Sequence, residues 1–385
     1  MQSLITCTLI IALISTCFGS YDTSCNVIDF GAVGDGKTDD SAAFLKAWES
    51  SCGAEGTPTL LIPPNYVFLF SALILKGPCK ATTILIKLEG KIVAPTKYSW
   101  VDNNNENSLI VITKVDRLTV DGTEGLIDGF GSSWWPCKSC PRPSILIFQY
   151  CNNLTVHDFT VSNSPKSHIH VHGCENATFS RINVTAPADS PNTDGIDVTF
   201  SKNILIQDSY MQTGDDCIAI SGGSSSVNVT GIACGPGHGI SIGSLGKRND
   251  TVEGIHVRNC SLTKTKYGAR IKTFPVGIGC AKQITFEDIT LVETRYPIFI
   301  DKNYDSYPST NEEVEVSGVT FRGFQGTSFD GKAITLDCGE SGCYDIVLDQ
   351  INIVSSLPAK PACCSCNNAH GTVTSTVPNC SCLLS

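Results

Sequence analysis

A six-residue pattern that recurs nine times is the feature that most constrains how this chain can fold. In each copy two apolar residues alternate with variable residues, and the last position is usually Asp, Asn or Gly. Apolar residues at every second position are typical of a strand with one buried face. From residue 153 onward the copies start 23 to 35 residues apart; all nine are at 117–122, 153–158, 176–181, 203–208, 226–231, 254–259, 283–288, 318–323 and 345–350.

A second series of apolar residues runs between these copies. Two interleaved series with a period of 22 to 35 residues predict a solenoid in which each coil contributes several short strands. A propeller would need blades of about 40 residues, and a sandwich would show hairpin signals. We therefore predict an all-β chain that forms a single-domain right-handed parallel β-helix. The second series consists of Ile169, Ile196, Ile218, Ile240, Ile271 and Ile298.

Residues 1–19 are typical of a secretory signal. An apolar run at 9–14 is followed by small residues, although no Lys or Arg precedes the run. The run is too short to span a bilayer, so a membrane anchor is the weaker interpretation. We predict a secreted, extracellular protein without a membrane partner, in which residues 20–385 form one β-helix domain.

Both ends of a solenoid need caps. Asp40 and Ser41 precede a segment at about 42–51 that places Phe44 and Trp48 on one helical face. We predict a short N-terminal capping helix with Asp40–Ser41 at its start. The cysteine-rich C-terminal tail is expected to cap the other end.

Removal of the predicted signal leaves 18 of the 20 cysteines. In a secreted chain an even number of cysteines predicts disulfides. A zinc site at Cys137 and Cys140, or in the tail, is the alternative, but it lacks a well-spaced second pair or a histidine partner. Seven Asn-x-Ser/Thr sequons agree with a glycosylated secreted protein; they begin at Asn153, Asn176, Asn183, Asn228, Asn249, Asn259 and Asn379.

Four polar clusters, at 192–194, 214–216, 237–239 and 270–272, lie beside isoleucines of the second series. When three of these isoleucines are aligned, Asp194, Asp216 and His238 each lie two residues before the anchor. Neighbouring coils are about 4.8 Å apart, so this column would span on the order of 10 Å. Asp215 lies directly beside it.

Carboxylates crowded in this way cannot all ionise without cost, so at least one pKa should rise. A raised pKa lets one residue type supply both an acid and a base, and glycosidic hydrolysis requires such an acid and base. Ordinary turn residues are the structural alternative for each group taken alone. A calcium site is another, but His238 and the nearby cations Arg270 and Lys272 argue against a hard-cation site. We predict no metal and no cofactor.

The formal net charge of −10 argues against a nucleic-acid partner, and an anionic substrate would need a local basic patch. Arg270 and Lys272 flank Ile271, so both side chains should point away from the core. Such a patch beside an acid cluster suggests a substrate that carries carboxylates next to the cleaved bond. A solvated charge run is the alternative, and it fits the neighbouring lysines better; the other nearby cations are Lys247, Arg248, Lys264 and Lys266.

These residues together resemble the four signature motifs of the polygalacturonases, glycoside hydrolase family 28, in the order and spacing of that family. The segment 30–40 also resembles the opening of plant members, and the resemblance covers essentially the whole mature chain. The motifs are Asn192-Thr-Asp194, Gly214-Asp-Asp-Cys217, Cys234-Gly-Pro-Gly-His-Gly-Ile-Ser-Ile-Gly-Ser244 and Arg270-Ile-Lys272.

The resemblance implies a role for each matching residue. Asp215 is expected to be the general acid, and Asp194 and Asp216 the pair that activates water, with His238 supporting the acid. Groups expected to bind substrate are Asn192, Arg270, Lys272 and Tyr304. Disulfides are expected between Cys217 and Cys234 and between Cys338 and Cys343. This chain differs from plant members at two positions: Phe274 stands where they often carry Trp, and Asp305 where Cys is common.

The implied activity is hydrolysis of α-1,4-linked galacturonan, a pectic polysaccharide, with inversion, by a monomer in the cell wall. Two alternatives are a rhamnogalacturonan hydrolase of the same fold and a catalytically silent pectin-binding wall protein. The sequence leaves endo or exo action open, because it does not show where loops close the groove.

Overall fold

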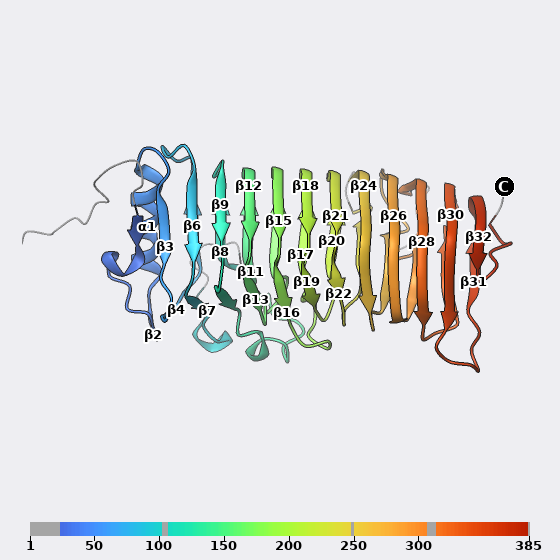
Figure 1. Cartoon of the computed structure of the whole chain (residues 1–385), viewed down its shortest axis with the longest axis horizontal. Coiled ribbons are helices and arrows are strands. Elements are labelled where there is room, and N and C mark those ends of the chain that lie inside the picture. The colour runs from blue at the N-terminus through green and yellow to red at the C-terminus, as the bar shows by residue number, and fades with distance from the viewer. Residues whose placement is uncertain (1–23, 102–106, 248–249, 306–312, 384–385) are drawn as a thin grey trace, which may run out of the picture.

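The computed structural model describes residues 24–101, 107–247, 250–305 and 313–383. The chain winds into a long stack of coils, with the helix α1 at the N-terminal end (Figure 1). The architecture is a right-handed parallel β-helix, so the predicted fold class is confirmed. The predicted secretory signal, 1–19, lies outside the described residues. Among the helices described, none is long and apolar enough to cross a membrane.

One sheet contains eleven strands, one from each successive coil, and all its pairings are parallel. The second isoleucine series lies in this sheet. Its strands are β5 (Leu73–Lys76), β8 (Ser108–Thr113), β11 (Ser144–Gln149), β14 (Ile169–His172), β17 (Ile196–Thr199), β20 (Ile218–Ser221), β23 (Ile240–Leu245), β25 (Tyr267–Thr273), β27 (Tyr296–Asp301), β29 (Lys332–Asp337) and β31 (Cys363–Asn367).

The six-residue pattern lies in a second sheet of 21 strands. In the C-terminal coils its strands lengthen to as many as 16 residues. The strands that carry this ladder are β1 (Ser24–Asn26), β3 (Thr59–Ile62), β6 (Ile84–Leu88), β9 (Leu118–Asp121), β12 (Asn152–His157), β15 (Glu175–Ser180), β18 (Lys202–Gln207), β21 (Ser225–Thr230), β24 (Asp250–Thr263), β26 (Gly279–Thr294), β28 (Glu315–Ser328), β30 (Cys343–Ser355) and β32 (Ala369–Val377).

A third ladder of short strands belongs to the same sheet, and the sequence pattern did not reveal it. Apart from β2, which has five residues, these strands have two or three, and such a strand buries too few side chains to show a period. In the later coils these short strands join the strands of the six-residue pattern to form single long strands. They are β2 (Asp35–Asp39), β4 (Val67–Leu69), β7 (Lys91–Val93), β10 (Leu126–Asp128), β13 (Thr160–Ser162), β16 (Asn183–Thr185), β19 (Tyr210–Gln212) and β22 (Ala233–Cys234); three 3-10 turns are η1 (Val27–Phe30), η2 (Lys97–Ser99) and η3 (Gly131–Ser133).

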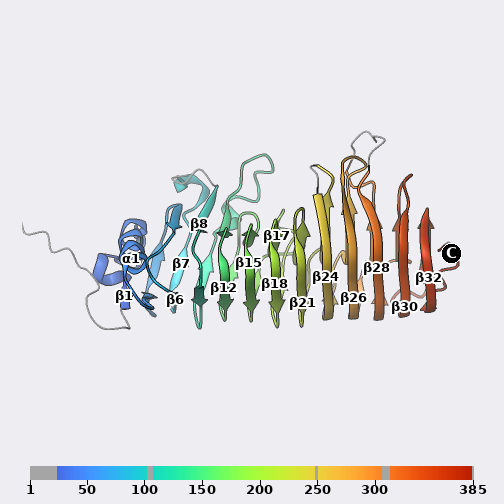
Figure 2. The same cartoon turned by 90° about the horizontal axis from the view of Figure 1, so that it is seen from above.

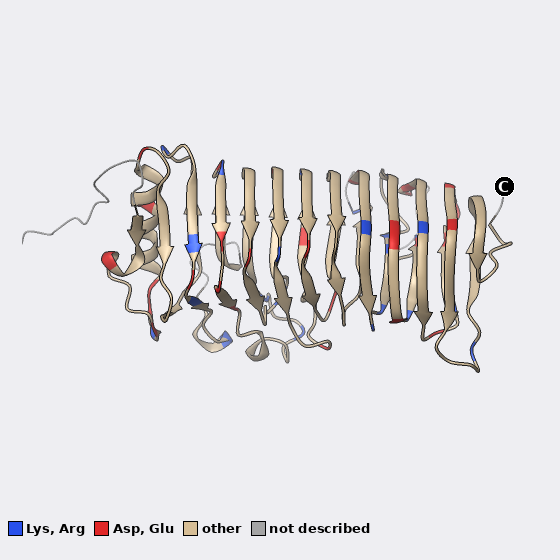
Figure 3. Cartoon of the chain, in the orientation of Figure 1, with Lys and Arg blue, Asp and Glu red and all other residues tan. Residues whose placement is uncertain are grey.

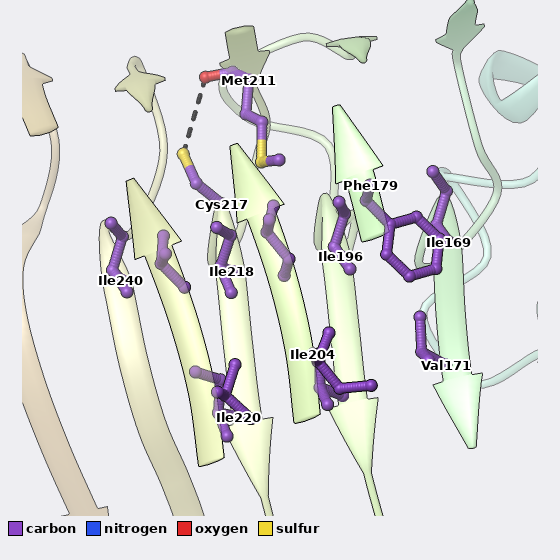
Figure 4. Packing of buried hydrophobic residues seen from close by; sticks show 14 of the residues in the cluster. Ile169, Val171, Phe179, Ile196, Ile204, Met211, Cys217, Ile218, Ile220 and Ile240 are labelled. Carbon is purple, nitrogen blue, oxygen red and sulfur yellow. Dashed lines mark hydrogen bonds between the residues drawn. The ribbon is translucent and has the colours of Figure 1, made fainter. Parts of the chain in front are cut away.

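Inward side chains stack in columns along the axis of the coils. Ile169, Ile196, Ile218 and Ile240 pair across four adjacent strands, and each is at most 1% exposed. Figure 4 shows these side chains on neighbouring strands. Burial of one such side chain stabilises the fold by roughly 1.5–3 kcal/mol, so each added coil extends one continuous core.

The helix α1 (Ser41–Gly53) covers the first coils and begins after Asp40, as predicted, but the Asp40 side chain does not cap it. Phe44 packs edge-on against Phe68 and Phe70, with ring centroids 5.2 and 4.1 Å away. Asp40 makes no side-chain cap hydrogen bond to the helix. Its carboxylate instead accepts backbone N–H groups from the preceding turn, including that of Val33 at 2.6 Å, because that turn leaves those donors free.

The predicted CxxC pair and both disulfides implied by the family resemblance are present, and two further bonds join the tail. The expectation that the cysteines all pair is not met: five described cysteines carry free thiols. The bonds whose two cysteines both lie among the described residues are Cys52–Cys79, Cys137–Cys140, Cys217–Cys234, Cys338–Cys343, Cys364–Cys380 and Cys366–Cys382; the free thiols there belong to Cys151, Cys174, Cys260, Cys280 and Cys363.

Charges on the C-terminal part of the larger sheet alternate in sign from strand to strand (Figure 3). Arg258, Glu287, Arg322 and Asp349 occupy paired positions on β24, β26, β28 and β30. Arg322 Nε lies 2.9 Å from Asp349 Oδ2. These groups are exposed or partly exposed, so each pair contributes little to stability.

Candidate active site

The candidate site lies where the chain enters β17, β20 and β23 of the eleven-stranded sheet. The anchor isoleucines of these strands pair in register, and backbone hydrogen bonds extend the register to the residues just before each strand. Asp194, Asp216 and His238 therefore occupy equivalent positions in three successive coils. Figure 2 shows that the segment between β10 and β11 rises on the same side as β8 and β17.

Short cross-links hold the first three motif loops together. Thr193 Oγ1 accepts the backbone N–H of Gly214 at 2.9 Å, and the Cys217–Cys234 disulfide joins the second loop to the third. A Cβ at Gly214 would lie 1.9 Å from the carbonyl oxygen of Ser190. Only glycine permits this close approach, which places the two aspartates that follow it.

The carboxylate of Asp215 contacts a different partner through each oxygen. Its Oδ1 accepts from His238 Nδ1 at 2.8 Å and from the backbone N–H of Asp216 at 2.9 Å. Its Oδ2 accepts from Asn192 Nδ2 at 3.3 Å. The side chains of Asp215 and His238 are 19% and 27% exposed, so a ligand can reach both.

Burial acts to raise the pKa of Asp215, but the opposing effects are together larger. The hydrogen bond and charge of His238, the charge of Lys272 and the N–H of Asp216 lower this pKa below its ordinary value. The lowered pKa favours the ionised form of Asp215, which can accept the hydrogen bond from His238 Nδ1.

Asp216 is fully buried and has a separate set of partners. Its Oδ2 lies 2.6 Å from Lys272 Nζ, and its Oδ1 accepts from Ser241 Oγ at 2.7 Å. Arg270 NH1 lies 4.0 Å from Oδ1. Burial is the largest effect on the pKa of Lys272 and acts to lower it, but the charge and hydrogen bond of Asp216, with the charge of Tyr304, together outweigh it and raise that pKa. Asp216 is thus held as an oriented, charge-compensated carboxylate.

A fourth carboxyl group, Asp197, joins the cluster and was not among the residues predicted from the sequence. Burial raises its pKa to about 7, against an opposing hydrogen bond from Ser167. Burial also raises the pKa of Asp194 well above its ordinary value, and the charges of Asp197, Asp215 and Asp216 add to this effect. The signal for Asp197 was available, because it alternates with buried Ile196 and so points outward.

Arg270 and Lys272 lie on the outward face of β25, and aromatic rings surround them. The Arg270 guanidinium lies 3.9 Å from the Tyr267 ring centroid and 5.1 Å from that of Tyr304. Lys272 Nζ lies 5.4 Å from the Tyr304 ring. These rings hold the two cations beside the acids. Tyr304 packs edge-on against Phe274 at 5.5 Å.

The other predicted cations are more peripheral. Lys264 is exposed and lies 4.0 Å from Glu293 Oε2. Lys266 lies over the Tyr267 ring at 5.2 Å, and Lys247 lies over the Phe274 ring at 4.5 Å. Arg248 lies outside the described residues.

Two buried groups behind the site carried no signal in the sequence. Arg142 donates from NH2 to Asn192 Oδ1 at 2.7 Å. His168 is fully buried; burial lowers its pKa to about 4, and its Nδ1 lies 2.9 Å from the carbonyl oxygen of Asp194. Both belong to coils that precede the motifs, so only the three-dimensional stacking brings them here.

One donor atom from each of Asp215, Asp216 and His238 lies within 4.8 Å of the other two, so a cation site has to be considered. The donors are already occupied, since His238 binds Asp215 and Lys272 compensates Asp216. A hard cation prefers a shell of oxygen ligands without neighbouring positive side chains. The chemistry of this donor set fits proton transfer better than metal binding.

The arrangement provides one carboxylate, Asp215, that contacts an imidazole. Beside it lie two carboxyl groups with a raised pKa, Asp194 and Asp197, and one whose charge a lysine compensates, Asp216. Such a separation of protonation behaviour supplies an acid and a base from one residue type. Arg270 and Lys272 supply positive charge at the edge of the cluster. The face can therefore bind an anionic ligand and move protons at one of its bonds.

Comparison with known proteins agrees with this chemistry. The family described as "Glycosyl hydrolases family 28" matches residues 52–382. A probable polygalacturonase of Arabidopsis thaliana is 44% identical over 375 residues, covering 94% of this chain and 81% of that protein. A polygalacturonase of Persea americana is 40% identical over 367 residues, covering 91% and 78%. An exopolygalacturonase of Zea mays is 38% identical over 370 residues, covering 92% and 88%.

Among solved structures, the endo-xylogalacturonan hydrolase of Aspergillus tubingensis aligns with a TM-score of 0.79 and 26% identity, covering 92% of this chain and 99% of that one. The polygalacturonase of Erwinia carotovora aligns with a TM-score of 0.75 at 20% identity, covering 94% and 99%. The second similarity concerns the fold alone.

Proposed function

The chain belongs to glycosyl hydrolase family 28, and we propose that it hydrolyses α-1,4-galacturonosidic bonds in polygalacturonate, the backbone of pectin. The observation that supports this most directly is the Asp215–His238 pair, at 2.8 Å, beside the Asp216–Lys272 pair, at 2.6 Å. One pair can deliver a proton while the other holds a base.

In the proposed reaction Asp215 protonates the leaving glycosidic oxygen. Asp216, with Asp194, orients a water molecule and takes up its proton as the water attacks the anomeric carbon from the opposite side of the sugar. Attack from that side inverts the anomeric configuration. His238 contacts Asp215 directly and can pass a proton to it after each turnover.

The charge state of the unliganded site differs from the one this reaction needs, because Asp215 starts ionised. A galacturonate unit brings a carboxylate toward Arg270 and Lys272 and excludes water from the cleft. Added negative charge and lost solvation both raise the pKa of a carboxyl group. We propose that substrate binding raises the pKa of Asp215 so that it takes up a proton, with His238 as its neighbouring donor, and so becomes the acid.

Substrate binding is assigned to Arg270 and Lys272, with Tyr304 and Asn192 beside them. The bidentate geometry of a guanidinium suits a sugar carboxylate, and the Tyr267 and Tyr304 rings keep the Arg270 plane in place. Since pectin is a wall polymer, we propose that the protein is secreted and acts outside the cell. We also propose that it acts as a monomer.

A galacturonan with xylose branches is a second candidate substrate, favoured by the similarity to the xylogalacturonan hydrolase. The experiment that tests the main proposal is incubation of the purified protein with polygalacturonate, rhamnogalacturonan and xylogalacturonan in parallel. Release of reducing ends from polygalacturonate, with inverted anomers by proton NMR, is expected. Binding to polygalacturonate without turnover would contradict the proposal and favour a silent wall protein.

A further inference from the structure

Arg142 lies in the segment between β10 and β11, about fifty residues before the first site motif in the chain. It is only 8% exposed. Its guanidinium donates from NH1 to the carbonyl oxygens of Pro191 and, at 3.4 Å, Pro165, and from NH2 to Asn192 Oδ1 at 2.7 Å. One side chain therefore ties its own loop to the loops that lead into β14 and β17.

The contact with Asn192 fixes the orientation of that amide. Arginine has donors and no acceptor, so the oxygen of the amide has to face Arg142. The NH2 group of Asn192 then faces the other way and donates to Asp215 Oδ2 at 3.3 Å. Asn192 has a left-handed backbone with φ 55°, which asparagine tolerates better than most residues.

The oxygen that receives this bond matters for proton transfer. Asp215 Oδ1 already accepts from His238 and from the backbone N–H of Asp216. Among the described residues, the hydrogen bond that reaches Oδ2 comes from Asn192. Oδ2 is therefore the oxygen that can carry the proton to a ligand, and Asn192 sets its direction.

We propose that Arg142 is a positioning residue that locks the Asn192 amide so that its NH2 group, and not its oxygen, faces the Oδ2 of Asp215. This inference rests on the proposed function for its kinetic consequences. Without Arg142 the amide can turn over and present its oxygen to Oδ2. An acceptor there would bind the protonated form of Asp215 and keep its proton from the leaving oxygen.

The charged groups around Asp215 are His238, Lys272, Asp194 and Asp216, and none of them contacts Arg142 through a described hydrogen bond or ion pair. Replacing Arg142 therefore changes the amide without removing a direct charge partner of the acid. A donor lost from a carboxylate raises its pKa. The alkaline limb of the pH profile of kcat/KM, which requires the protonated acid, should then move to higher pH.

The test compares wild type with Arg142→Gln, Arg142→Lys and a matched control, Arg181→Gln. Arg181 is an exposed arginine directly after β15 that binds Asp158, which follows β12. On polygalacturonate we expect Arg142→Gln to lower kcat on the order of tenfold to a hundredfold, the cost of a misplaced catalytic group. KM should change little, and the lysine variant should recover part of the loss.

Coupling to Asn192 separates positioning from simple destabilisation. In an Asn192→Leu background the Arg142→Gln change should have little further effect on kcat, because the amide on which it acts is gone. Equal losses in both backgrounds, or a loss of thermal stability with an unchanged pH profile, would overturn the inference.

A second readout does not depend on the proposed reaction. Carbon-13 NMR of labelled aspartate carboxyl groups, with the Asp215 signal identified by its loss in Asp215→Asn, gives the titration of Asp215 directly. Arg142→Gln should move that titration to higher pH, and Arg181→Gln should not. If the wild type hydrolyses no pectic polymer but this shift is seen, the proposed function fails and the positioning inference stands; no shift overturns the inference whatever the activity.

Discussion

Asp215 and Asp216 are adjacent in the chain, yet their carboxylates bind different partners: His238 Nδ1 at 2.8 Å from Asp215, and Lys272 Nζ at 2.6 Å from Asp216. A proton can pass within the first pair, because an imidazole N–H can donate directly to the carboxylate oxygen that it contacts. The second pair is a buried ion pair in which the lysine compensates the acid. Neighbouring residues of one type thus acquire separate chemical behaviour.

Replacing Asp215 by asparagine should abolish most activity while leaving the fold intact. General acid catalysis contributes on the order of a hundredfold to ten-thousandfold to a rate, and the amide keeps the size and polarity of the side chain. Reducing-end release from polygalacturonate measures the loss. Circular dichroism and thermal unfolding serve as controls, and undiminished release in a folded variant would contradict the assigned role.

Replacing Lys272 by methionine should unfold the protein more easily as well as inactivate it. The variant leaves Asp216 buried without its cation, and breaking a buried ion pair from one side costs about 3–5 kcal/mol. Denaturant unfolding measures this loss. The double variant Lys272→Met/Asp216→Asn removes the unpaired charge and should be more stable than Lys272→Met alone; equal stability of the two variants would show that the pair is not charge-compensated as described.

Asp197 should make the folded protein less stable as pH rises from about 4 to about 7. Its pKa is raised from 3.8 to about 7 in the folded state, so the folded chain binds more protons than the unfolded chain in this window. Stability then falls with increasing pH. Partial exposure to solvent weakens the effect, and we expect about 2 kcal/mol out of the roughly 4 that the full shift represents.

The check on Asp197 is denaturant unfolding of wild type and Asp197→Asn at several pH values. Asparagine cannot ionise, so the variant should lack this part of the pH dependence. Its free energy of unfolding should therefore increase relative to that of the wild type toward pH 7. The lowered pKa of Asp215 acts in the opposite sense, since its contribution is lost as pH falls below its ordinary range. Parallel curves for wild type and variant would contradict the burial of a protonated Asp197.

Replacing Arg270 by lysine should weaken recognition of the galacturonate carboxylate. Lysine keeps the charge but loses the planar, two-pronged donor set and the stacking on Tyr267. We expect KM for polygalacturonate to rise about tenfold, the value of one good charge-assisted hydrogen bond. The comparison substrate is methyl-esterified pectin, which lacks the carboxylate charge, and on it the variant and the wild type should differ little. Equal effects on both substrates would argue against carboxylate recognition.

Much of the fold could be predicted from the repeat alone. Alternating apolar residues identify strands, and the period of the pattern identifies coils, so the stacking of Ile196, Ile218 and Ile240 followed from spacing. The third ladder of short strands was not predicted, because strands of two or three residues bury too few side chains to show a period. The Asp40 carboxylate was misassigned because the same residue type caps a helix or a turn, and only the path of the chain decides which donors it meets.

The sequence by itself determined the coil repeat, the shared register of Asp194, Asp216 and His238, and the outward direction of Arg270 and Lys272. These follow from local periodicity, which the pleat of a strand converts directly into direction. Only the tertiary structure decided that His238 binds Asp215 while Lys272 binds Asp216, that Asp197 enters the cluster, and that Arg142 reaches Asn192. Contacts across coils depend on side-chain packing, burial and competing charges, and none of these has a period that can be read along the chain.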